Sequence, residues 1–184
     1  KTIIIASGVN HRKLQVPGEE EFTGRGVSYC SICDAPFFKD KTVAVIGGGN
    51  SGFRTALDLA PYAKKIYIFE ASSRVRADEV FQEKAKQLGI GIIFNSKVLE
   101  IKGTQEIEKI IYKDLISQEV KDFSVEGVFV EIGSIPATDF LNNLVEYDEK
   151  GAVKINPKTC ETKTPGLFAA GDVTDIEYKQ LIIA

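Results

Sequence analysis

The chain has 184 residues, of which 43% are hydrophobic and 27% charged, and its formal net charge at pH 7 is −3. This balance is typical of globular proteins with one or two domains and a real buried core. There is no run of about 20 apolar residues to span a bilayer and no signal-peptide pattern at the start, so a cytoplasmic protein is expected. Because charges of both signs are scattered along the sequence, neither nucleic acid nor an anionic membrane is expected as a partner.

The first feature along the chain is a cysteine pair, Cys30-Ser31-Ile32-Cys33. Three cysteines are too few for a secreted disulfide framework, so redox or metal chemistry is indicated. A bond across so short a loop contributes only about 2 kcal/mol to stability on the chain-entropy model. Zinc would need two more ligands, and only His11, Cys160 and carboxylates remain, so no metal site is expected. A dithiol that cycles with a disulfide is favoured over two incidental thiols, and Asp34 could shuttle the proton.

The following segments alternate between strand and helix patterns. Continuous apolar residues over 42–46 predict a strand buried in a parallel sheet, and 66–69 and 92–94 predict two more. Helices are predicted over 51–62 and over 79–88, the second with Asp78 as its cap and Gly89 as its stop. The residues expected to face the core are Phe53, Ala56, Leu57 and Ala60 in the first helix and Val80, Phe81, Ala85 and Leu88 in the second.

The pattern then changes to short alternating segments. Residues 98–101, 107–112 and 120–123 predict an antiparallel meander of three strands. Residues 127–132 and 167–170 return to continuous apolar strands. The sequence therefore predicts an α/β fold with a parallel sheet and a three-stranded antiparallel insert.

A glycine-rich loop, Gly47-Gly48-Gly49-Asn50-Ser51-Gly52, joins the first predicted strand to the first helix. The G-x-G-x-x-G pattern is weak by itself, and a structural turn without a ligand is the alternative. Here a strand precedes the loop, a helix follows, and Glu70 comes 18 residues after Gly52, where a carboxylate can accept hydrogen bonds from ribose hydroxyls. The N–H groups at the helix start would hold a pyrophosphate, so a dinucleotide is favoured.

The Cys-x-x-Cys-Asp motif followed by a strand and this glycine loop resembles the low-molecular-weight thioredoxin reductases and the related flavoprotein subunit of alkyl hydroperoxide reductase. Residues 6–8, which include Gly8, and residues 16–19 resemble family segments before the redox motif. Residues 127–130 together with residues 132–136, which include Ile132 and Gly133, resemble the border of the nicotinamide site. Residues 166–172, with Gly171 and Asp172, resemble a stretch that binds FAD, and residues 178–180, with Lys179 and Gln180, resemble the flavin-ring contact.

The resemblance implies that a Rossmann-like nicotinamide domain is inserted into an FAD domain. The implied parts are residues 1–25 from the FAD domain, residues 26–156 as the NAD(P)H-binding domain with the cysteine pair, and residues 157–184 from the returning FAD domain. The family's first G-x-G-x-x-G, which binds the ADP part of FAD, is not in this sequence. The chain alone is therefore expected to bind a nicotinamide dinucleotide but not to hold FAD.

Two departures from the family pattern concern the nucleotide. NADPH-using members carry His-Arg-Arg after the second strand, whereas this chain has Glu70-Ala71-Ser72, and of the clamping arginines only Arg76 is kept. NADH is therefore expected to be preferred over NADPH, although Arg74 could partly compensate. Arg54 occupies the helix position where the family usually carries a glutamate near the nicotinamide.

The activity implied by the resemblance is a disulfide reductase. NADH would reduce FAD, the flavin would reduce the Cys30–Cys33 disulfide, and the dithiol would reduce a thioredoxin-like or peroxiredoxin-system protein. In the family pattern Cys33 faces the flavin, Cys30 attacks the partner and Asp34 is the acid–base group, and the complete enzyme is expected to be a homodimer. The alternative is a non-catalytic nicotinamide-binding module whose cysteine pair is a sensor or inert. Members that reduce ferredoxin lack this cysteine pair.

Overall fold

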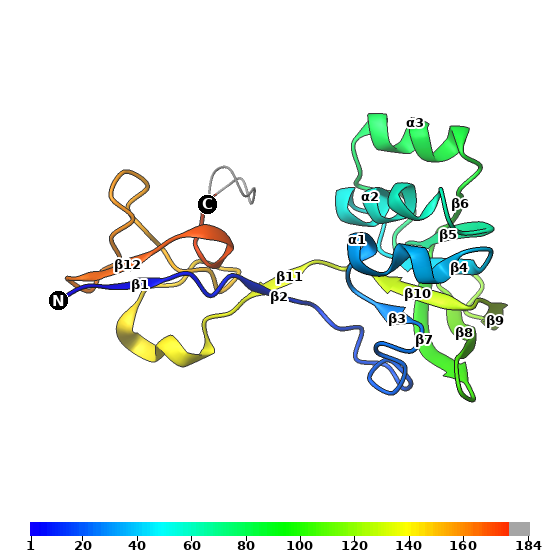
Figure 1. Ribbon diagram of the computed structural model, residues 1–184, viewed down its shortest axis with the longest axis horizontal. Helices are drawn as coiled ribbons and strands as arrows, with labels where there is room; N and C mark the ends of the chain where they lie inside the picture. The colour runs from blue at the N-terminus through cyan, green and yellow to red at the C-terminus, as the bar shows by residue number, and fades with distance from the viewer. Residues whose placement is uncertain (177–184) are drawn as a thin grey trace. The chain divides into compact units, whose positions relative to one another are not determined.

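The computed structural model describes residues 1–176, and in it the chain forms two compact units. Residues 12–133 form one, called here the central unit (Figure 1). Residues 1–11 and residues 134–176 form the other, the outer unit. These units begin and end at different residues from the domains expected from sequence, and the bounds 1–25, 26–156 and 157–184 stay a prediction.

A five-stranded parallel sheet organises the central unit, in the order β3-β10-β4-β5-β6. The strands are β3 (Val27–Ser28), β10 (Gly127–Val130), β4 (Thr42–Ile46), β5 (Lys65–Phe69) and β6 (Gly91–Ile93). The middle strands β4 and β10 are almost wholly buried, as continuous apolar runs in a covered sheet should be. The predicted strands 42–46, 66–69, 92–94 and 127–132 are thus confirmed, with ends that differ by one or two residues.

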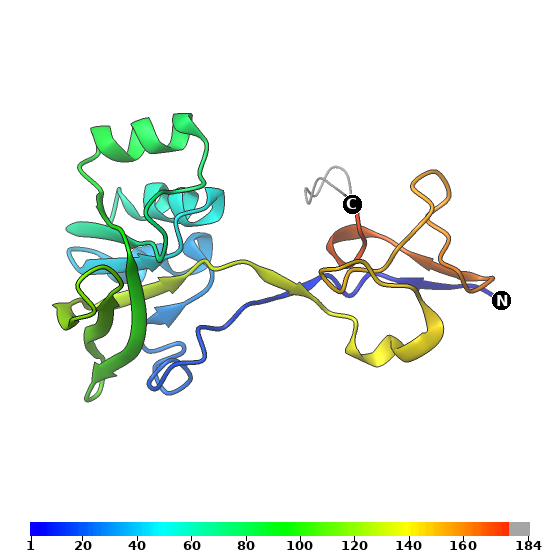
Figure 2. The same cartoon turned by 180° about the vertical axis from the view of Figure 1, so that it is seen from behind.

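Helices cover one face of this sheet. They are α1 (Ser31–Asp34), the 3-10 helix η1 (Ala35–Phe38), α2 (Asn50–Leu59) and α3 (Glu79–Gln87). Phe53, Ala56 and Leu59 of α2 pack with Val43 and Val45 of β4. Figures 1 and 2 show α2 between α3 and the sheet.

Helix α3 corrects part of the sequence interpretation. Phe81 and Ala85 pack on the core as expected, but Val80 and Leu88 are 61% and 58% exposed. Phe81 and Ala85 are four residues apart and share one face, whereas Val80 is turned about 100° away and Leu88 lies past the last turn. Asp78 occupies the cap position, but its side chain makes no capping bond.

The antiparallel meander covers the other face of the sheet (Figure 2). Its strands are β7 (Ser96–Gly103), β8 (Ile107–Asp114) and β9 (Val120–Ser124), which confirms the predicted insert. Alternate residues of the parallel strands, such as Ala44, Ile46 and Val128, point to this face and pack on Ile101 and Ile110. The central unit therefore has three layers, with helices on one side of the sheet and strands on the other.

The outer unit is built from short strands. β1 (Ile3–Ile5) pairs in parallel with β12 (Leu167–Ala169), and β2 (Val9–His11) pairs with the antiparallel β11 (Ser134–Pro136). Two 3-10 helices, η2 (Asp139–Leu144) and η3 (Gly171–Val173), complete the assigned elements of its described part. Ile5, Val153 and Ala169 lie in its small core. None of the helices within residues 1–176 has the length and apolar character needed to cross a membrane.

Candidate functional site

The glycine loop adopts the tight turn that the sequence predicts between β4 and α2. Gly47 has a φ of +120°, and a Cβ on it would collide with the carbonyl oxygen of Glu131. A Cβ on Gly52 would collide with the carbonyl oxygen of Gly47, because α2 packs directly against the loop. Nothing lies within 4 Å of the corresponding position on Gly49, so this part of the loop is open to a ligand. Two glycines are therefore required by packing, and the third leaves the backbone accessible.

Glu70 lies at the end of β5 and is 6% exposed. Its Oε2 accepts a hydrogen bond of 2.7 Å from the Gly48 N–H, and its Oε1 accepts bonds of 2.8 Å from both the N–H and the hydroxyl of Ser72. Burial acts to raise the pKa of Glu70, but these hydrogen bonds and the charge of Arg76 outweigh it and leave the pKa below its ordinary value. Glu70 is therefore an anion at neutral pH that also fixes the glycine loop.

A cavity of about 510 Å³ opens over the loop within the central unit. Its lining includes nine of the predicted nucleotide residues, namely Gly47, Gly48, Gly49, Asn50, Ser51, Glu70, Arg76, Ile132 and Gly133. The volume is within the range of small-molecule sites. Gly52 acts through packing instead, and the guanidinium of Arg54 is not in the lining but lies 6.0 Å above the ring of Phe81.

Asn50 and Asp78 hold the segment that borders this cavity. The Asn50 amide donates to Asp78 Oδ2 at 3.0 Å, and the Asp78 N–H donates to Asn50 Oδ1 at 2.8 Å. The Arg76 N–H donates to the carbonyl oxygen of Gly48 at 2.9 Å. These bonds tie residues 76–78 to the glycine loop and place the Arg76 backbone beside it.

The cysteine pair is closed as a disulfide between Cys30 and Cys33. Cys30 is the N-cap of α1, and its sulfur accepts a hydrogen bond of 3.2 Å from the Cys33 N–H. Cys33 is exposed, whereas Cys30 is half-buried. Cys160 lies in the outer unit and is outside this disulfide.

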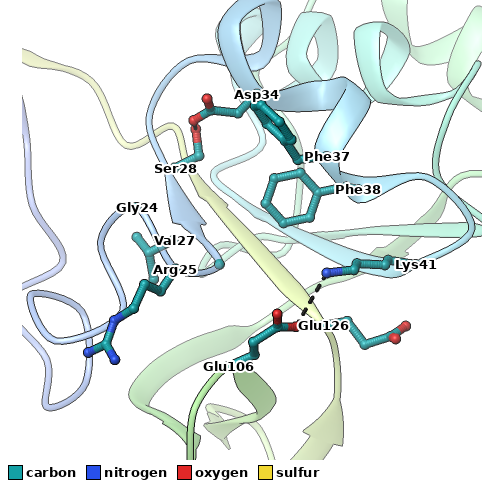
Figure 3. A pocket seen from close by; sticks show the side chains of 11 residues that line it. Gly24, Arg25, Val27, Ser28, Asp34, Phe37, Phe38, Lys41, Glu106 and Glu126 are labelled. Atoms are coloured by element: carbon teal, nitrogen blue, oxygen red, sulfur yellow. Dashed lines mark hydrogen bonds and ion pairs between the residues drawn. The ribbon is translucent and has the colours of Figure 1, made fainter.

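Asp34 is held by a residue that the sequence analysis missed. The hydroxyl of Ser28, which is only 4% exposed, donates to Asp34 Oδ2 at 2.6 Å and accepts from the Cys30 N–H at 3.1 Å. Figure 3 shows Asp34 turned toward Ser28 at the edge of a second cavity of about 430 Å³, which Phe37 also lines. No motif marks Ser28, and its two contacts form across the short link between β3 and α1.

The residues predicted to contact FAD lie in the outer unit. Because β1 and β12 are parallel neighbours, Gly8 and the pair Gly171 and Asp172 follow strands that end at the same edge. Gly8 and Gly171 have φ angles of +67° and +79°, which favour glycine. Lys179 and Gln180 lie outside the described residues.

Comparisons with known proteins agree with this geometry. The model of the pyridine nucleotide-disulphide oxidoreductase family matches residues 1–184. The F subunit of alkyl hydroperoxide reductase is 45% identical over 186 residues in Pseudomonas putida and 44% identical over 185 residues in Staphylococcus epidermidis. Each comparison covers 100% of this chain and 36% of the relative, so the chain spans about a third of the length of these proteins.

Two solved thioredoxin reductases have the same fold. The Lactococcus lactis enzyme, in its FR conformation, aligns with a TM-score of 0.91 and 38% identity, covering 100% of this chain and 61% of that one. The enzyme from T. acidophilum aligns with a TM-score of 0.90 and 38% identity, covering 98% and 60%. With its family model matched from end to end, the chain belongs to the pyridine nucleotide-disulphide oxidoreductase family.

Proposed function

We propose that this chain is the nicotinamide-binding and redox-disulfide part of a flavoprotein disulfide reductase. The observation that carries the proposal is that one compact unit, residues 12–133, contains both the glycine-loop cavity and a disulfide followed by Asp34. The names of the similar proteins support a thioredoxin-like or peroxiredoxin-system disulfide as the substrate. The homodimer and the cytoplasmic location stay predictions.

The proposed chemistry is thiol–disulfide exchange. The Cys30 thiolate attacks one sulfur of the partner's disulfide, the other partner sulfur leaves as a thiolate, and a mixed disulfide forms. Cys33 then attacks the Cys30 sulfur, so that the Cys30–Cys33 bond closes and the second partner thiolate leaves. The two protons of the dithiol pass to the partner, which is reduced, and Asp34 is the group proposed to relay them.

The cofactors restore the dithiol. When bound, a nicotinamide dinucleotide and FAD supply the two electrons that open the Cys30–Cys33 disulfide again. The glycine loop and Ser51 would hold the pyrophosphate, with Glu70 at the adenosine ribose. Gly8, Gly171 and Asp172 would contact FAD, together with Lys179 and Gln180. This chain is expected to bind no FAD by itself.

NADH is proposed as the preferred nucleotide. Glu70 is anionic at neutral pH because hydrogen bonds hold its pKa down, and a 2′-phosphate beside it would carry nearly two negative charges. Arg76 lines the same cavity, and its positive charge favours the 2′-phosphate of NADPH. A unit charge pair about 4 Å apart contributes roughly 4 kcal/mol at an effective dielectric of 20. Because solvent reduces this energy, we expect NADH to bind about 10- to 150-fold more tightly than NADPH.

The test uses a protein of the relatives' full length that contains this chain. Cys30→Ser and Cys33→Ser should each lower the rate of NADH-dependent reduction of a chromogenic disulfide substrate at least about 100-fold, because the dithiol is the reductant. Both should keep NADH-dependent reduction of ferricyanide, which needs no cysteine. Cys160→Ser, the matched control, should keep both activities. Disulfide reduction at the parental rate by Cys30→Ser would contradict the proposal.

A further inference from the structure

Glu131 is a carboxylate beside the glycine loop that the sequence analysis did not select. It follows β10 directly, its N–H donates to the carbonyl oxygen of Ile46 at 2.8 Å, and its own carbonyl packs against Gly47. The residue is half-buried and lines the same cavity of about 510 Å³ as Glu70. One cavity therefore has a carboxylate on each side of its loop.

The sheet order places these two carboxylates at opposite halves of a bound dinucleotide. β5, which is followed by Glu70, lies on one side of β4, and β10, which is followed by Glu131, lies on the other. In sheets of this order the dinucleotide crosses the carboxyl ends of the strands at the point where the strand order reverses. With adenosine at the β5 side and pyrophosphate at the loop, the nicotinamide half reaches β10.

Thr55 fixes the orientation of the Glu131 side chain. It lies on α2, is 3% exposed, and its hydroxyl donates to Glu131 Oε1 at 2.7 Å. A threonine hydroxyl has one hydrogen, so this short bond uses it. Arg54, which precedes Thr55 on α2, places its guanidinium over the ring of Phe81 and not in the cavity. The fixed carboxylate on this side of the cavity is therefore that of Glu131.

We propose that the Glu131 carboxylate binds the nicotinamide half of the dinucleotide, accepting a hydrogen bond from the carboxamide N–H or from a hydroxyl of the adjoining ribose, with Thr55 as the positioning residue. The proposal rests on the proposed function, since it needs a nicotinamide dinucleotide in this cavity. Hydrogen bonds to an ionised acceptor are about twice as strong as neutral ones. The carboxylate would thus give the nicotinamide half a polar contact that the loop and Glu70 do not provide.

The experiment is calorimetric titration of the 184-residue chain with NADH, ADP-ribose and ADP. Glu131→Gln should weaken NADH binding about 10-fold and leave ADP binding unchanged within about two-fold. A loss for NADH alone assigns the contact to the carboxamide, and an equal loss for ADP-ribose assigns it to the ribose hydroxyl. Glu83→Gln, which removes the same charge from an exposed position on α3, is the control and should bind all three ligands like the parent.

Thr55 provides the second arm. Thr55→Val keeps the shape but removes the hydroxyl, and should weaken NADH binding several-fold without affecting ADP, whereas Thr55→Ser should bind like the parent. If Glu131→Gln binds NADH as tightly as the parent, the inference is wrong but the proposed function stands. If Glu131→Gln loses affinity for ADP as much as for NADH, the inference is also wrong, because Glu131 then only supports the glycine loop. A parent chain that binds ADP but not NADH would overturn the proposed function with it.

Discussion

At the scale of single residues, Ser28 explains how the redox motif is held. Its buried hydroxyl bridges the backbone of Cys30 and the carboxyl group of Asp34. A buried or half-buried carboxylate that loses a hydrogen-bond donor also loses its fixed position. Ser28 should therefore matter to thiol chemistry without touching sulfur itself.

Ser28→Ala should slow the reduction of the Cys30–Cys33 disulfide by dithiothreitol about 10-fold at neutral pH, because the Asp34 carboxyl group is no longer held in position by the Ser28 hydroxyl. Asp34→Asn should slow it more, by about 100-fold, and change the pH profile of the rate. Stopped-flow measurement on the 184-residue chain checks both. Ser124→Ala, at an exposed position of β9, is the control, and equal rates in Ser28→Ala and the parent would rule out the positioning role.

Nucleotide choice is also decided at this scale, and Ala71 is the position at which to alter it. Ala71 is exposed and lines the cavity, whereas Glu70 also holds Gly48 and cannot be replaced without disturbing the loop. Ala71→Arg should move the ratio of NADH to NADPH affinity about 10-fold toward NADPH by adding a guanidinium at the 2′-phosphate. Ser73→Arg adds the same charge at an exposed position outside the cavity lining and should change the ratio little.

Calorimetric titration of both nucleotides at one ionic strength measures that ratio. Tighter binding of NADPH than of NADH by the parent chain would refute the argument from Glu70.

The glycine loop, Glu70 and the cysteine pair could be read from the sequence because each has a fixed local spacing. Glu131 could not, because its partner Thr55 is 76 residues away along the chain. Ser28 is only six residues from Asp34, but no known motif marks a serine at that spacing. A serine in a short strand and a glutamate after an apolar run are ordinary in any sequence. The significance of Glu131 depends on a distant part of the chain, and that of Ser28 on the conformation of the turn before the cysteine pair.

At the scale of elements, most strands of the central unit from β4 onward and β12 were predicted, whereas the short strands β1, β2, β3 and β11 were not. β2 and β11 have three residues each and half-exposed or exposed side chains, so no burial pattern marks them. Only their pairing with each other makes them strands. Val80 and Leu88 were also predicted wrongly, because fewer of the apolar side chains of α3 are buried than its sequence pattern suggests.

The hairpin between β8 and β9 has a carboxylate at its turn. Asp114 accepts bonds from the N–H groups of Ile116 and Ser117 and, at 2.9 Å, from the amine of Lys121. The Lys121 bond first, and then the backbone bonds, lower the pKa of Asp114 to about 2. A carboxyl group with a lowered pKa stabilises the folded state above its ordinary value of 3.8, and this contribution is lost as pH falls toward about 2.

Asp114→Asn should therefore unfold at lower urea concentration than the parent at pH 7, since the charge pairing and the turn are weakened. The difference between the two midpoints should shrink as pH falls from about 4 toward 2, because the parent then loses the same charge. Urea unfolding followed by circular dichroism between pH 7 and 2.5 measures it. Asp122→Asn, whose oxygen lies 3.9 Å from the Lys109 amine, is the control and should show little difference.

At the scale of the whole molecule, the stretch before the redox motif belongs to the central unit. Phe22 is 2% exposed in the core beside the meander, and Leu14 and Val16 pack against the same core. Glu19, 3% exposed, accepts bonds from the Leu14 N–H and the Tyr29 hydroxyl. Burial, with the Glu19 carboxylate adding to it, raises the pKa of Tyr29 to about 12. The bounds expected from the family resemblance assign this stretch to the FAD domain instead.

The two sets of bounds therefore make different predictions for separate expression. A chain of residues 12–133 should fold cooperatively, form the Cys30–Cys33 disulfide and bind NADH like the 184-residue chain, without a yellow colour, because it keeps the core and the cavity lining. A chain of residues 26–156 lacks Phe22, and removing a buried phenylalanine side chain alone costs about 3–5 kcal/mol, a large part of the stability of a small domain. It should melt at a clearly lower temperature or fail to fold. Calorimetric melting of both chains decides between the bounds, and equal stability would favour those expected from sequence.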